Sequence, residues 1–106
     1  MDETKLSVII GRAVMDADLT PQDAGLLFEE EITLNLYNRY TVTGLIGPSA
    51  KALIGSRVTN VTETSEHAIL EFDSNVRIEI DLTDDAYTSP EAMQLRVPGS
   101  PIMIWS

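Results

Sequence analysis

Cysteine is absent from this chain of 106 residues, and histidine occurs only once, as His67. Without cysteine the chain cannot form disulfides, thiolate metal sites or a cysteine nucleophile. A single histidine cannot supply the several ligands of a zinc site, and no Gly-x-Ser-x-Gly motif accompanies it. We interpret His67 as a solvated turn residue, and we expect no cofactor.

Basic residues are also scarce, with 7 Lys and Arg against 17 Asp and Glu, for a net charge of −10. This charge opposes the approach of phosphate backbones and anionic lipids, so we expect neither nucleic acid nor a membrane as partner. No apolar run approaches the ~20 residues of a membrane helix, and the first five residues are acidic where a secretion signal would be basic. We therefore expect a cytoplasmic protein whose acidic surface keeps it soluble or steers a basic partner toward it.

The chain has the length of one domain, so we expect residues 1–106 to form a single one. Residues 10–37 and 54–81 align without a gap at an offset of 44, with seven identical positions that include Gly11/Gly55 and Phe28/Phe72. This alignment predicts an internal duplication. The repeats would lie at about 4–38 and 48–82, followed by a unique C-terminal segment, 84–106.

Each repeat ends in two segments in which apolar and polar residues alternate, the pattern of a β-hairpin with one face on a core. In the second repeat a three-residue loop, Asp73–Asn75, pairs Phe72 with Val76 and keeps every apolar side chain on one face. Asn75 then occupies a left-handed position, which asparagine tolerates. The first repeat follows the same scheme around the acidic loop Glu29–Glu31.

The segment before each hairpin is expected to contain a short helix and a bulged strand. Helical turns are predicted over 4–10 and 48–54, each stopped by a following glycine in the left-handed region. Val58 and Val61 are three apart, so a β-bulge is needed to point both side chains inward. Each repeat is thus predicted to be a helical turn and a three-stranded antiparallel meander.

The unique segment is expected to differ from the repeats. Residues 89–93 have a cap, a first-position proline and an early acid, which predicts a short helix extending over 90–95. Residues 98–101 predict a turn and 102–105 a final strand. The expected fold class is mainly β: two related meanders plus a C-terminal strand, arranged as a sandwich or small barrel with pseudo-twofold symmetry.

A set of positions resembles a pattern in small uncharacterised bacterial proteins. It consists of Leu53-Ile54-Gly55, Val58, Val61, Leu70-Glu71-Phe72, Asp81-Leu82, Pro90-Glu91-Ala92 and Ile104-Trp105. Those proteins have no assigned activity, so the resemblance implies a bacterial source and no function.

Carboxylates provide the only candidates for a metal site. Asp81, Asp84 and Asp85 lie within five residues and could bind calcium through their oxygens. The spacing of an EF-hand loop is missing, as is a glycine for its sharp turn, which favours a solvated acidic loop.

Interaction candidates are the acidic loop Glu29–Glu31, Tyr87, and the C-terminal Met103 and Trp105. Met103 and Trp105 alternate with Ile102 and Ile104, and we expect Met103 and Trp105 to be the pair that faces away from the core. Either the predicted helix over 90–95 covers that pair, or it is a surface patch whose strand edge favours a homodimer.

Three functions remain open. The leading hypothesis is a non-enzymatic bacterial binding module, similar to an immunity protein or antitoxin, whose carboxylates attract a basic partner. The alternative is a small-ligand-binding β domain with its pocket between the two repeats. A metal-dependent enzyme that uses carboxylates alone is the least favoured.

Overall fold

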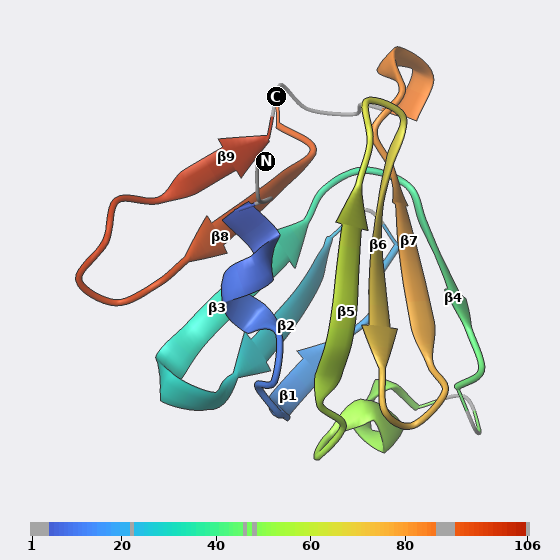
Figure 1. Cartoon of the computed structure of the whole chain (residues 1–106). Coiled ribbons are helices and arrows are strands. Elements are labelled where there is room, and N and C mark those ends of the chain that lie inside the picture. The colour runs from blue at the N-terminus through green and yellow to red at the C-terminus, as the bar shows by residue number, and fades with distance from the viewer. Residues whose placement is uncertain (1–4, 22, 46, 48, 87–90, 106) are drawn as a thin grey trace.

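The computed structural model describes residues 5–21, 23–45, 47, 49–86 and 91–105, and it is mainly β, as expected (Figure 1). Its strands are β1 (Val14–Asp18), β2 (Ala24–Phe28), β3 (Ile32–Leu36), β4 (Tyr40–Thr43), β5 (Val58–Glu63), β6 (His67–Phe72), β7 (Arg77–Asp81), β8 (Met93–Arg96) and β9 (Met103–Trp105). Short 3₁₀ helices are η1 (Lys5–Ile9), η2 (Glu29–Glu31), η3 (Ala50–Leu53) and η4 (Asp84–Ala86). The strands form two antiparallel sheets, ordered β1-β2-β3-β8-β9 and β4-β7-β6-β5, and both contribute to one hydrophobic core.

The predicted register of both hairpins is confirmed. The Phe72 N–H donates to the Val76 carbonyl at 2.9 Å, and Leu70 lies opposite Ile78. Asn75 has a φ of 65°, the left-handed conformation that the three-residue loop requires. In the first hairpin Glu31 takes the equivalent place with a φ of 63°. The alternation of apolar side chains therefore determines the strand register, even in the first hairpin, where the loop residue Glu31 does not favour a left-handed conformation.

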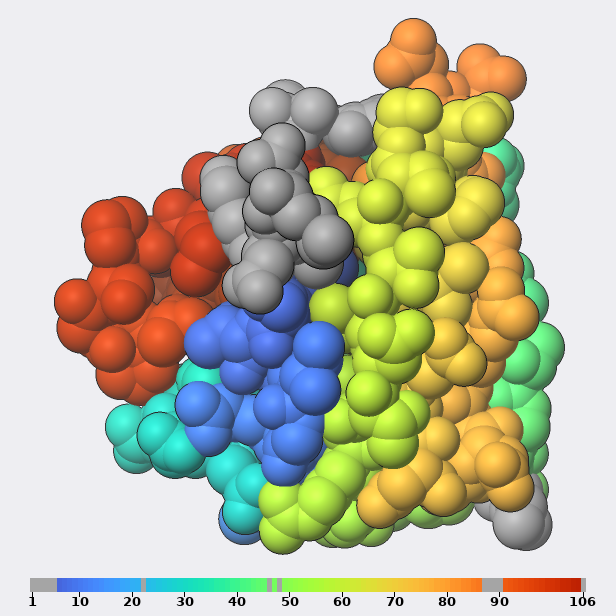
Figure 2. Space-filling view, viewed as in Figure 1, coloured from blue at the N-terminus to red at the C-terminus, as the bar shows by residue number. Residues whose placement is uncertain are grey.

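The predicted lead-in segments are also confirmed. The helical turns are η1 and η3, and the glycines that follow them, Gly11 and Gly55, have φ values of 85° and 91°. The β5–β6 register shifts between Val58 and Asn60, which is the expected bulge, and β1 carries a matching shift. Figure 2 shows η1 lying alongside β5 on the molecular surface.

The two halves contact each other through reciprocal hydrogen bonds. The Gly11 N–H donates to the Val58 carbonyl at 2.7 Å, and the Gly55 N–H donates to the Val14 carbonyl at 2.8 Å. Adding 44 to Gly11 gives Gly55, and subtracting 44 from Val58 gives Val14, so the two bonds are related as a local two-fold axis would relate them. These contacts fit the duplicated pattern, while the duplication itself stays a prediction.

Two strands were not predicted, and each crosses to the sheet of the other half. β4 follows β3 in the chain but pairs with β7, and β8 follows β7 but pairs with β3. Tyr40 lies opposite Ile80, and Met93 lies opposite Leu36. Ile80 and Leu36 are 44 residues apart, so β4 and β8 occupy equivalent positions in the two sheets.

The helix predicted over 89–93 and extended over 90–95 is wrong for the residues that the structure describes. Glu91 and Ala92 are not helical, and Met93–Arg96 forms β8; residues 89 and 90 lie outside the described residues. Met93 and Leu95 are fully buried while Gln94 and Arg96 alternate with them. Two core positions and a complete ladder with β3 outweigh the weak helical preference of a proline and an acid.

No helix in the described part of the chain is long and apolar enough to cross a membrane.

Candidate binding site at the β4 edge

β4 forms one edge of the four-stranded sheet, while β8, its equivalent, is covered by β9. Figure 1 shows β4 and β9 at opposite sides of the molecule. The difference changes burial: Met93 and Leu95 of β8 are 0% exposed, whereas Tyr40 and Val42 of β4 are only partly buried. The sequence pattern Tyr-Thr-Val-Thr, an alternating run rich in β-branched residues, was the available signal for this strand.

An apolar groove of about 460 Å³ runs between β4 and the β1–β2 loop. It is lined by Leu19, Pro21, Arg39, Tyr40, Val42, Leu45 and Ala50. Tyr40 closes one part of it, because its hydroxyl donates a hydrogen bond to the Thr20 carbonyl at 2.9 Å. Burial, and secondarily the nearby Asp18 carboxylate, raise the pKa of Tyr40, so the phenol stays protonated and remains a donor.

A second, polar hollow of about 370 Å³ lies on the other side of the same residues. Arg39 and Tyr40 line both hollows, and the polar one adds Thr41, Glu66, His67, Glu79, Asp81 and Thr83. The start of β4 therefore separates an apolar groove from a hollow that is rich in carboxylates. Such a pair can hold an apolar and a cationic group of one ligand at the same time.

Asn38 anchors the chain where it passes from β3 to β4. It is fully buried; its side-chain amide donates to the Asp81 carbonyl at 2.8 Å and its backbone N–H donates to the Ala92 carbonyl at 3.0 Å. These bonds connect the end of β7 to the segment before β8. The Oδ1 atom of Asn38 is buried without a hydrogen-bond partner among the described residues. The donor groups of Asn38 are bonded, and their bonds hold the start of β4 relative to both sheets.

Asp81, one of the predicted calcium ligands, is engaged by neighbouring donors. The Thr83 hydroxyl donates to Asp81 Oδ1 at 2.6 Å, the Arg39 guanidinium to Oδ2 at 2.8 Å and the Thr83 N–H to Oδ1 at 2.9 Å. In that order, these bonds lower the pKa of Asp81 from 3.8 to about 2. Asp84 and Asp85 lie on η4, and in the described residues no three His, Asp or Glu side chains gather as a metal ligand set.

We expect Asp81→Asn to lower stability at neutral pH by about 1 kcal/mol, after allowing for solvent screening of a side chain that is 31% exposed. The folded pKa lies below the unfolded one, so the carboxylate stabilises the fold above the unfolded value of 3.8. That contribution is lost as the pH falls toward the folded value of about 2. Urea denaturation should therefore give a wild-type to mutant difference that shrinks over this interval. Asp84→Asn is the control, and a difference that is independent of pH would contradict the assignment.

The acidic loop Glu29–Glu31 is partly neutralised by two arginines. Glu29 accepts from the Ala13 N–H at 2.8 Å and from Arg57 at 3.0 Å, and Glu30 pairs with Arg12. The Ala13 hydrogen bond is the main cause that lowers the pKa of Glu29; desolvation opposes it, and the Arg57 charge adds to the lowering. The Glu29–Arg57 ion pair links the loop to the second half, whereas Ala13 and Arg12 belong to the same half as the loop.

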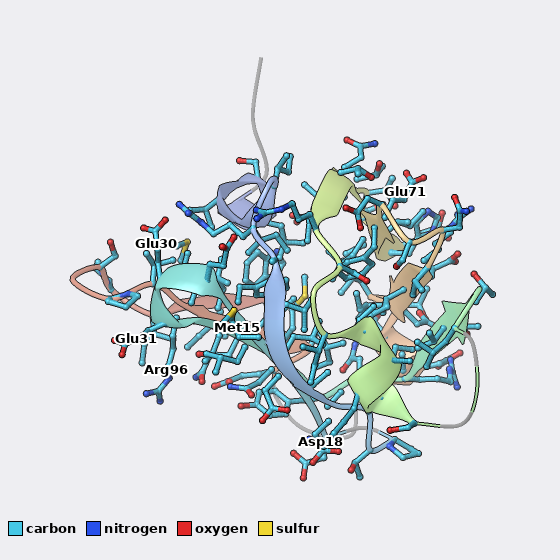
Figure 3. All side chains as sticks on the ribbon, turned by 90° about the horizontal axis from the view of Figure 1, so that it is seen from below. Met15, Asp18, Glu30, Glu31, Glu71 and Arg96 are labelled. Atoms are coloured by element: carbon cyan, nitrogen blue, oxygen red, sulfur yellow. The ribbon has the colours of Figure 1, made fainter. Side chains whose placement is uncertain are left out.

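Figure 3 shows Glu30, Glu31 and Arg96 near the η2 bend, with Met15 beside them and Glu71 on the other half of the molecule. Met15 and Leu27 line a shallow hollow of about 450 Å³ together with the three glutamates and Phe28. The carboxylates of the chain are thus dispersed over both halves.

The C-terminal interaction candidates face inward. Met103 and Trp105 pack against the core, and the indole N–H of Trp105 donates to Glu63 Oε2 at 3.0 Å. Ile102 and Ile104 are the exposed pair, at 44% and 43%. Tyr87 lies outside the described residues. None of the interaction candidates that the structure describes lies at the β4 edge; among the sequence candidates, Asp81 lines the polar hollow beside it.

Comparison with models of protein families, with curated proteins and with solved structures finds no match to this chain. The bacterial source that the sequence pattern implies therefore stays a prediction.

Proposed function

We propose that this protein is a non-enzymatic interaction module that binds a basic segment of a partner protein, as an immunity protein or antitoxin would. The observation that carries the proposal is the β4 edge, which no described strand covers and where Tyr40 and Val42 stay partly exposed beside an apolar groove. An edge strand offers unpaired backbone groups to another chain, and a groove beside it can hold that chain's side chains. The net charge of −10 favours a cationic partner by steering its approach.

Selection from a library of displayed random octapeptides tests this function without assuming where the peptides bind. We expect enriched peptides that combine Lys or Arg with apolar residues. Their affinity should fall at least threefold when NaCl is raised from about 50 to about 300 mM, because salt screens surface charge. Matched peptides with Lys and Arg replaced by Glu are the control. Selection that enriches no basic peptide, or binding that is independent of salt, would overturn the proposal.

A small-ligand-binding domain is the second candidate, because the groove volume of about 460 Å³ falls within the usual size of ligand pockets. Its lining residues come from both halves of the chain: Leu19 and Pro21 belong to the first half and Ala50 belongs to the second. Stabilisation of the protein by an uncharged metabolite in a thermal-shift screen would favour this reading over peptide binding.

A further inference from the structure

β9 shows how a strand is held at one sheet edge, and β4 offers the equivalent edge with no strand beside it in the described part of the chain. We propose that an extended, basic segment of a partner protein adds to β4 as a fifth strand of the second sheet, in the place that β9 takes beside β8. This inference rests on the proposed function and specifies its geometry: antiparallel strand addition, with apolar side chains at alternate positions and flanking Lys or Arg.

The backbone of β4 has hydrogen-bonding groups that face away from β7. The Asp81 N–H donates to the Arg39 carbonyl at 3.0 Å, so residues 39 and 81 form a hydrogen-bonded pair. Such pairs alternate along an antiparallel ladder, which directs the backbone of Thr41 and Thr43 toward β7. The N–H and C=O groups of Tyr40 and Val42 therefore point to the free edge.

In the other half of the molecule, the same groups are paired. The Tyr37 N–H donates to the Ala92 carbonyl at 2.8 Å, so by the same alternation Met93 and Leu95 direct their backbone groups away from β3. β9 lies on that edge, with Trp105 opposite Met93 and Met103 opposite Leu95. A strand added to β4 would meet Tyr40 and Val42 in the same way.

The side chains of β9 indicate what the added strand should carry. Met103 and Trp105 pack inward, and Trp105 reaches Glu63 at the end of β5. The residue equivalent to Glu63 is Leu19, which lines the apolar groove beside β4. Beside β8, the indole of Trp105 therefore meets a carboxylate, whereas a strand beside β4 would meet the apolar side chain of Leu19. The inward-facing side chains of the partner strand should accordingly be large and apolar.

Charge selects a partner protein over a second copy of this chain. Glu66, Glu79 and Asp81 line the polar hollow next to β4. Arg39 pairs with Asp81 and Arg77 pairs with Glu79, so the carboxylates outnumber the arginines there. A second copy carries the same net charge of −10 and would be repelled overall, whereas a segment with flanking Lys or Arg would be attracted. The experiment must therefore distinguish self-association through β4 from binding of a partner strand.

The probe is a synthetic peptide, Lys-Lys-Ile-Met-Ile-Trp-Lys-Lys, which places β9 and the preceding Ile102 between lysines. The readout is amide hydrogen exchange of the full chain by NMR. In the free protein the amides of Thr41 and Thr43 should exchange slowly and those of Tyr40 and Val42 fast. Saturating peptide should slow Tyr40 and Val42 at least tenfold, because hydrogen-bonded amides exchange only after opening.

Two N-methylated peptides provide the matched control, because they leave the protein unchanged. Only alternate amides of an added strand face β4, so methylating one alternate set should weaken binding at least tenfold and methylating the other should have little effect. A peptide with glutamate in place of lysine should also bind at least tenfold more weakly.

Each other result contradicts strand addition by a basic partner. Binding without protection of Tyr40 and Val42, or equal loss from both methylated peptides, overturns the geometry and leaves the proposed function standing. Protection of both amides without peptide, together with a doubled mass by light scattering, identifies a second copy as the occupant. Failure of the peptide to bind overturns the inference of strand addition. The proposed function is tested separately, by the selection of displayed octapeptides.

Discussion

Phe28→Ala is expected to lower the free energy of unfolding by about 3 to 5 kcal/mol, as for other buried phenylalanines. Phe28 is 0% exposed, lies opposite Ile32 across the first hairpin and belongs to the core that both sheets share. Removing its ring leaves a cavity that the surrounding strands can only partly fill. Since domains of this size have a total stability of roughly 5 to 15 kcal/mol, urea denaturation followed by circular dichroism should show a much lower midpoint.

Phe72 and Leu27 provide the comparison that makes this prediction specific. Phe72 is the equivalent residue in the second hairpin and is 4% exposed, so Phe72→Ala should have a similar cost. Leu27 is the neighbour of Phe28 on the opposite face of β2 and is only partly buried, so Leu27→Ala should cost about 1 kcal/mol or less. If Leu27→Ala were as destabilising as Phe28→Ala, the facing of β2 would be wrong.

That facing was predictable because it depends on a local pattern. A one-residue slip would move Leu70 and Ile78 from the core to solvent, so alternation alone selects the three-residue loop. The bulge after Val58 followed from the same requirement, since two inward valines three residues apart cannot lie on a regular strand. Features that depend on neighbours in the sequence can therefore be predicted from the sequence alone.

The exchange of β4 and β8 was not predictable by this reasoning because it depends on contacts distant in sequence. Tyr40 pairs with Ile80, forty residues later, and nothing local to Tyr40 specifies that partner. For β8, the proline at 90 and the acid at 91 favour a helix. The burial of Met93 and Leu95 beside β3 outweighs this helical preference, and the sequence before them does not indicate it.

The candidate site was inaccessible for the same reason. Its groove joins Leu19 from one half to Ala50 from the other, with Tyr40 between them, and a groove between segments leaves no spacing pattern in the sequence. Met103 and Trp105 were expected to form either a covered layer or a surface patch. They pack on the core instead, so β9 shows how an added strand at the β4 edge would be held.

Gly44→Ala should cost about 2 to 5 kcal/mol, because two effects add at this residue. Its φ is +84°, where a side chain costs about 1 to 2 kcal/mol. A Cβ on Gly44 would also lie 2.2 Å from the Asn75 carbonyl oxygen, and relieving that overlap requires a backbone shift worth about 1 to 3 kcal/mol. Gly47 isolates the first effect, since it has the same φ of +84° and no described atom within 4 Å of its Cβ position.

We therefore expect Gly47→Ala to lose only about 1 to 2 kcal/mol in the same denaturation experiment. Gly44 directly follows Thr43, whose partner Arg77 begins β7 just after the Asn75 turn. A backbone shift at this contact would displace β4 along with it, so Gly44→Ala should also weaken peptide binding at the β4 edge, whereas Gly47→Ala should not. Equal stability of the two variants would contradict the close approach of Gly44 to the β6–β7 turn, and with it the contact that fixes the end of β4.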